Sequence, residues 1–138
     1  MRSLSIRLAA AASLAFASAS CGPPVRNTPI GDIPKIATLD EVMDNQATIA
    51  DPQFAKREQT SFTEADYAGF TEMSERIKAL SLKTKDFSKG PEFDALAMKL
   101  NQQAESLGKA AAAKDAAAAG GALQDMKATC KECHSKFR

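Results

Sequence analysis

Apolar residues recur at intervals of three and four along most of residues 38–138, which is the spacing of amphipathic helices. The clearest apolar face begins near residue 64 and runs to about Lys85. Its members are Tyr67, Phe70, Met73, Ile77 and Leu80. Charged residues between them fit a solvated outer face, and no strand pattern is visible. The pattern therefore predicts an all-α fold.

Two helix starts are marked by the S/T-x-x-E form of a capping box, in which a hydroxyl and a carboxylate each bond a free backbone N–H. They are Thr38-Leu39-Asp40-Glu41 and Ser61-Phe62-Thr63-Glu64. The first helix has an imperfect apolar stripe made by Leu39, Val42, Met43, Ala47, Ile49 and Ala50. We expect Asp51-Pro52 to bend or break this helix, because proline removes a backbone donor and restricts the residue before it.

Two further helices follow in the C-terminal half. Pro91 stands at a favourable first helical position after Lys89-Gly90. The third stripe contains Phe93, Leu96, Leu100, Ala104 and Leu107 and extends to Ala113. Lys114-Asp115 marks a turn, with Asp115 placed to cap a last helix whose stripe is Leu123, Met126, Cys130, Cys133, His134 and Phe137. Four amphipathic helices with short connections predict an antiparallel four-helix bundle over residues 38–138.

The N-terminal residues differ in composition from this domain. Residues 1–20 have the layout of a secretory signal, with Arg2 and Arg7 before a short apolar run that is too short to span a membrane. Residues 22–37 hold four prolines and two glycines, so neither a helix nor a central strand is expected there. We interpret residues 21–37 as a Pro-rich tether.

Cys21 lies directly after the small residues Ser18-Ala19-Ser20, an arrangement that resembles a bacterial lipoprotein processing site. It departs from that pattern at Ser18, where leucine is usual. The alternative is ordinary cleavage after Ala17 or Ala19, which would leave Cys21 as a free thiol, an unattractive group in an exported protein. Lipidation of Cys21 is therefore the preferred interpretation, and it would place the protein on a membrane surface in the cell envelope or periplasm.

The charge balance argues against nucleic acid as a partner. The chain carries 18 basic and 17 acidic residues. Removing residues 1–20 deletes two arginines and no acid, which leaves 16 basic against 17 acidic residues and a formal charge of −1. No basic patch remains that would bind nucleic acid.

The C-terminal run Cys130-Lys131-Glu132-Cys133-His134 has the C-x-x-C-H form of a covalent haem attachment site. On a helix its two cysteines and its histidine project from adjoining positions on one face. The two thiols would form thioethers with the haem vinyl groups, and the neutral imidazole would be the proximal iron ligand. The interpretation predicts one covalent haem c.

Two other kinds of site compete for these residues. A structural zinc site closes with four ligands, whereas this run offers three, and the chain's remaining cysteine is Cys21, with no second histidine. A dithiol redox site usually accompanies a βαβ pattern, which the chain lacks. Export and helical context both favour haem.

The chain resembles the class II c-type cytochromes, the cytochrome c′ family, over about residues 38–138. The features that match are the ending Cys130-Lys131-Glu132-Cys133-His134-Ser135-Lys136-Phe137-Arg138, the Ala-rich hairpin before it and the four-helix order. The resemblance implies that Cys130 and Cys133 bind haem, that His134 is the proximal ligand and that Arg138 lies near the haem pocket or a propionate. It also implies that two copies of the chain could form a homodimer, paired through their first two helices.

Members of that family differ at the sixth iron position, which is either open or filled by a methionine of the first helix. Met43 matches this ligand region best and is the candidate distal ligand; otherwise it lines the pocket. Met126 shares a helix with His134 and should lie beside the haem, while Met73 and Met98 fit core packing. With one histidine in the chain, ligation by two histidines of the same chain is excluded.

Three functions follow from these alternatives. The first is a one-electron carrier that exchanges electrons with redox partner proteins. The second is a five-coordinate haem protein that binds gases such as nitric oxide or carbon monoxide. An enzymatic role ranks last, because the sequence offers no distal histidine and no clear acid–base pair. A purely structural lipoprotein would require the C-x-x-C-H run to be accidental.

Overall fold

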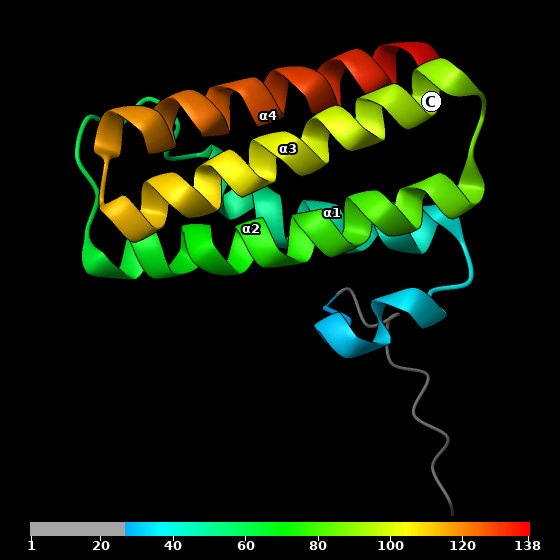
Figure 1. The fold of residues 1–138 in the computed structure, drawn as a ribbon, viewed down its shortest axis with the longest axis horizontal. Helices are drawn as coiled ribbons and strands as arrows, with labels where there is room; N and C mark the ends of the chain where they lie inside the picture. Colours follow the sequence, from blue (N-terminus) through cyan, green and yellow to red (C-terminus); the bar gives the residue numbers. More distant parts are fainter. Residues whose placement is uncertain (1–26) are drawn as a thin grey trace, which may run out of the picture.

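The computed structural model describes residues 27–138, so the signal peptide and the lipidation predicted at Cys21 lie outside the described residues. Four long helices follow one another: α1 (Leu39–Phe54), α2 (Glu64–Thr84), α3 (Pro91–Ala113) and α4 (Ala116–Phe137). Two short 3-10 helices, η1 (Ile30–Lys35) and η2 (Lys85–Phe87), precede α1 and α3. The predicted all-α four-helix bundle is confirmed (Figure 1). In it α3 packs against α2 and α4, whereas α1 packs mainly on α2 and touches α4 little.

Both predicted capping signals lie at helix starts, but the second differs in register. The Thr38 hydroxyl accepts the backbone N–H of Glu41 at 3.2 Å, as expected. For α2 the cap is Thr63 rather than Ser61. The carboxylate that accepts the backbone N–H of the cap, at 2.8 Å, belongs to Asp66 rather than Glu64. Asp66 also forms an ion pair with Lys56 at 2.7 Å, which joins the segment after α1 to the start of α2. The prediction of a box at Ser61 was therefore wrong by two residues.

Replacing Asp66 by asparagine should lower the thermal midpoint at neutral pH. The bond from Lys56, followed by those from Thr63, lowers the pKa of this carboxyl to about 2. Because this value lies below the unfolded pKa of about 3.9, the stabilisation is present above pH of about 4 and is lost as the pH falls through about 2. The difference between the two proteins should shrink over that window in thermal melts. Glu72→Gln, which removes an exposed acid further along the same helix, is the control, and an equal loss there would show that the Asp66 carboxylate has no special role as part of the cap.

Pro52 does not end α1. The helix continues to Phe54, so of the two predicted effects of Asp51-Pro52, a bend or a break, the break does not occur. Proline removes only its own N–H bond, which would have gone to the carbonyl of Thr48, and Thr48 is an exposed residue. Phe54 is buried, and its contribution to the core holds this last turn in helical form.

The prediction of a tether fails for the described part of that segment. Residues 30–35 form η1, and Ile33 and Ile36 are buried with Val42 and Leu80 in a small core cluster. The backbone at Thr28 is also held, by the Asn45 carboxamide at 2.7 Å and the Arg76 guanidinium at 2.8 Å. Two isoleucines in the proline-rich run thus supply the apolar contacts that dock it on α1 and α2. Residues 21–26 lie outside the described part of the chain.

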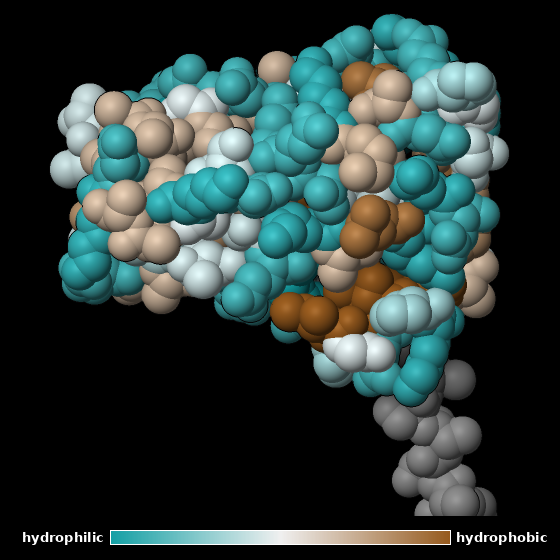
Figure 2. All heavy atoms as spheres, in the orientation of Figure 1, coloured by the Kyte–Doolittle hydropathy of each residue, from teal (hydrophilic) through white to brown (hydrophobic). Residues whose placement is uncertain are grey.

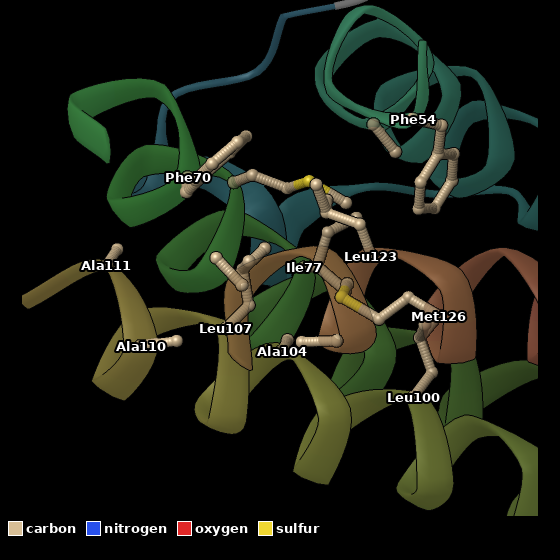
Figure 3. Packing of buried hydrophobic residues seen from close by; sticks show 14 of the residues in the cluster. Phe54, Phe70, Ile77, Leu100, Ala104, Leu107, Ala110, Ala111, Leu123 and Met126 are labelled. Atoms are coloured by element: carbon tan, nitrogen blue, oxygen red, sulfur yellow. The ribbon is translucent and has the colours of Figure 1, made fainter. Parts of the chain in front are cut away.

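The main core lies along the inner faces of all four helices (Figure 3). Its fully buried members include Phe70, Met73, Ile77, Leu107, Leu123 and Met126. Small residues allow the helices to approach closely: a Cβ on Gly108 of α3 would lie 2.5 Å from the Ser74 hydroxyl of α2. Glycine at position 108 therefore allows α2 and α3 to approach closely at this point.

The turn between α3 and α4 is as short as predicted. Lys114 adopts a left-handed conformation, with φ of 54°, and Asp115 accepts the N–H of Ala118 at 3.0 Å as the cap of α4. The Tyr67 hydroxyl donates to the Lys114 carbonyl at 3.0 Å and ties α2 to this turn. The hairpin therefore brings α4 back antiparallel to α3 through a turn of Lys114 and Asp115 alone.

The face shown in Figure 2 is mainly hydrophilic, with its strongest hydrophobic colour gathered toward the end of the bundle that η1 covers. The large hydrophobic residues exposed among residues 27–138 are Ile30 and Leu82. Within the same range, none of the helices combines the length and the apolar character needed to cross a membrane.

Candidate functional site

Cys130, Cys133 and His134 lie in the last two turns of α4. Both cysteines are half-buried free thiols, and His134 is exposed. Because α4 remains helical to Phe137, the spacing of three and four residues places these side chains on adjoining positions, as the sequence predicted.

A cavity of about 780 Å³ opens beside these residues. All four helices contribute to its wall, and α1 and α4 flank it where they make few contacts with each other. Its deeper wall is largely apolar and includes Phe54, Ile77, Phe93, Leu96, Leu100 and Met126. Cavities that enclose cofactors and ligands typically measure about 300–1,000 Å³ and are lined in this way.

The environment of the two thiols keeps them protonated. Burial raises the pKa of Cys130 to about 11, an effect that the nearby Lys127 charge only partly opposes. Burial also raises the pKa of Cys133, again against a smaller effect of a lysine, Lys89. Since the thiolate is the reactive form, both groups are poor nucleophiles on their own at neutral pH.

The predicted site residues within the described chain all line the same cavity. They are Met43 of α1, Cys130, Cys133 and His134 of α4, and the C-terminal Arg138. Among the other methionines, Met126 is fully buried and also lines the cavity, Met73 is fully buried in the main core, and Met98 is half-buried away from the cavity wall. Met43 is therefore the cavity-lining methionine that comes from a helix other than α4.

Charges of opposite sign lie on the two sides of the cavity. Basic residues come from α4, the C-terminus and the segment before α3: Lys89, Lys127, Lys131 and Arg138. Acidic residues come from α1: Asp40, Asp44 and Asp51. Lys127 joins the two sides, with its Nζ 3.5 Å from Asp51 and 4.8 Å from the ring centre of Phe54. The basic side chains provide partners for an anionic group bound beside α4.

The end of α4 is fastened to the start of α3. The Lys89 Nζ donates to the Phe137 carbonyl at 2.8 Å, and the Phe137 ring meets Phe93 edge-to-face at 5.3 Å. Lys136 adds ion pairs to Glu92 and Glu132. These contacts hold the turns that carry Cys133 and His134 in place.

Two polar features of the cavity wall were not predicted. Gln46 donates to the Thr84 hydroxyl at 3.2 Å, which links α1 to α2. Thr129 is buried, and its hydroxyl has no hydrogen-bond partner. The sequence signal that could have identified Thr129 is a polar residue beside Cys130 on an otherwise apolar helix face. Gln46 could not be identified in this way, because the imperfect apolar stripe of α1 did not show which face of that helix pointed inward.

The donor set fits haem c better than a closed metal site. No group of three or more His, Cys, Asp and Glu side chains within residues 27–138 is arranged to hold a metal ion. Haem attachment instead requires two free thiols, one imidazole, an apolar cavity and cations for the propionates, all of which border this cavity.

Comparisons with known proteins agree with this fit. A family model described as "Cytochrome C'" matches residues 34–138. A cytochrome c′ of Pararhodospirillum photometricum is 41% identical over 71 residues, which cover 51% of this chain and 57% of that protein. The alignment thus spans little more than half of that relative, and a comparison with solved structures finds no match. Because the family model covers most of the chain, the chain belongs to the cytochrome c′ family, whose members bind covalently attached haem c.

Proposed function

We propose that this protein is a monohaem c-type cytochrome that acts as a one-electron carrier in the bacterial cell envelope. Its haem is bound through Cys130 and Cys133, with His134 as the proximal iron ligand. The observation that carries the proposal is that these residues line one cavity together with Met43 of α1.

Each residue has a defined part in this role. Haem c, when bound, supplies the one-electron chemistry of its iron. The two cysteines hold the porphyrin edge against α4, and the contacts of Phe137 and Lys89 keep that helix end in place. Met43 provides a thioether ligand, which favours the reduced iron and raises the potential. The apolar wall excludes water, and the basic side chains pair with the propionates.

The proposal extends to location and partners. An exported protein lipidated at Cys21 would stay near a membrane and exchange electrons with redox proteins there. The domain would then follow the anchor closely, because Thr28 and η1 are already docked on α1 and α2. A carrier of this kind catalyses no reaction of its own, so we do not propose an enzymatic activity.

A gas-binding haem protein is the second candidate. It is favoured by the small residues Ala47 and Ala50, which line the α1 wall on the same face as Met43. If the Met43 sulfur does not coordinate the iron, this wall leaves room for a diatomic ligand. The two functions therefore differ in what Met43 does.

Visible spectra of the exported protein, with and without carbon monoxide, should separate the two functions. For a carrier, narrow ferrous bands should be unmoved by carbon monoxide, and Met43→Ala should turn the iron high-spin and open to it. Met98→Ala is the matched control, because Met98 is also half-buried but does not line the cavity. Carbon monoxide binding by the unaltered protein, with no spectral change in Met43→Ala, would favour the gas-binding role. Absence of haem absorption would contradict both.

A further inference from the structure

Residues 28–36, which we call the N-terminal strap, are fastened to α1 and α2 by buried polar side chains. The backbone N–H of Thr28 donates to the Asn45 carboxamide of α1 at 2.7 Å, and the Thr28 carbonyl accepts from the Arg76 guanidinium of α2 at 2.8 Å. Asn45 is fully buried and Arg76 is 6% exposed. Burying such groups costs free energy unless they are hydrogen-bonded. One residue of the strap thus links the two helices.

Two isoleucines of the N-terminal strap enter a small core cluster. Ile33 and Ile36 are buried there with Val42 of α1 and Leu80 of α2. Met43 is half-buried and packs against this cluster, and it also lines the cavity. Of the cluster and the side chains packed on it within residues 27–138, Met43 alone lines the cavity. It is therefore the residue at which the strap cluster and the cavity meet.

The helical period gives α1 two buried faces. Val42 and Asn45 lie three residues apart and contact the cluster and the strap, whereas Met43, Ala47 and Ala50 line the cavity. α1 touches α4 little, so its position depends mainly on α2. The N-terminal strap adds a second attachment to α1, through residues that do not line the cavity. The place of the α1 wall beside the cavity therefore depends on the strap.

We propose that the N-terminal strap is the positioning element for Met43: by clamping α1 to α2, it holds the Met43 thioether at the sixth position of the haem iron. Methionine has three rotatable bonds, so its backbone and its packing must fix where the sulfur lies. Supporting residues outside the ligand shell commonly orient metal ligands in this way. The inference rests on the proposed function, in which Met43 is the distal ligand, and assigns a part in it to residues that do not line the cavity.

The test is the rate at which carbon monoxide binds the ferrous, exported, full-length haem protein and its Ile33→Ala/Ile36→Ala variant. In a carrier, carbon monoxide binds only after Met43 has left the iron, so the rate reports that opening. The variant should react at least about tenfold faster, because losing two buried isoleucine side chains weakens docking of the strap. Leu107→Ala is the matched control. Leu107 is fully buried in α3, outside both the strap cluster and the cavity wall, so its loss should not accelerate the reaction in this way.

A double-mutant cycle shows whether the strap acts through Met43. In a Met43→Ala background the iron is already open, so the strap substitutions should not accelerate carbon monoxide binding further. A general loosening of the bundle would accelerate it in both backgrounds. Amide hydrogen exchange gives a reading that does not depend on the iron: residues 39–54 should exchange faster in the strap variant than in Leu107→Ala. If the double alanine variant does not accumulate, Ile36→Ala alone takes its place.

The outcomes separate this inference from the proposed function. An unchanged rate in a strap variant that carries covalent haem, with faster exchange in residues 30–36 showing that the strap has loosened, would overturn the positioning role and leave the carrier function intact. Equal acceleration in the Met43→Ala background would also overturn it, since the strap would not act through Met43. Rapid binding of carbon monoxide by the unaltered protein would instead remove the carrier function on which the inference rests.

Discussion

Replacing Cys130 and Cys133 together by alanine should abolish covalent haem in the exported protein. Both thiols are free and border the cavity, and each can form one thioether with the porphyrin. Without them, haem retained by His134 alone would dissociate when the chain is unfolded. Haem staining after denaturing electrophoresis should therefore fall to background, and the mass of the chain should match the polypeptide alone.

Ser135→Ala is the matched control for this change. Ser135 lies on the same end of α4, is exposed and does not line the cavity, so its loss leaves both thiols and the helix in place. Each single cysteine variant should retain at most one thioether and show a shifted visible spectrum. Covalent haem at the normal level in the double variant would show that the attachment site lies elsewhere in the chain.

Local sequence signals predicted the ends of most elements because their chemistry is local. Pro91 begins α3, Thr38 caps α1 and Asp115 caps α4, as expected. The start of α2 was wrong because Ser61 and Thr63 both precede an acid at the right spacing. The bond from Lys56 to Asp66 favours Thr63, and Lys56 belongs to a segment whose position depends on tertiary contacts.

The remaining errors also depend on contacts between distant segments. The proline content of residues 22–37 predicts an extended chain, but it does not show that Ile33 and Ile36 meet Val42 and Leu80. The same limit applies to the cavity. The motif on α4 identified Cys130, Cys133 and His134, whereas the opposite wall depends on which face α1 turns inward.

The bundle divides its residues between stability and cofactor binding. The half that contains the α3–α4 turn is closed by aromatic packing, with Phe70 fully buried in α2. Its ring meets Phe62 edge-to-face at 4.9 Å and Tyr67 at 6.1 Å, and Lys56 Nζ lies 5.9 Å from its centre. Phe70 does not line the cavity, so its contribution to stability can be measured separately from haem binding.

Phe70→Ala should reduce the free energy of unfolding by about 3–5 kcal/mol, because it removes a buried ring and leaves a space that helices of small residues cannot easily fill. Denaturant unfolding of the haem protein, followed by circular dichroism, measures this loss. The visible spectrum at low denaturant should stay unchanged, since the residues around the cavity are not altered. Leu82→Ala, at a position that is 53% exposed, should change stability by less than about 0.5 kcal/mol. A spectrum altered by Phe70→Ala in the folded protein would show instead that aromatic packing and the haem site are coupled along the whole length of the bundle.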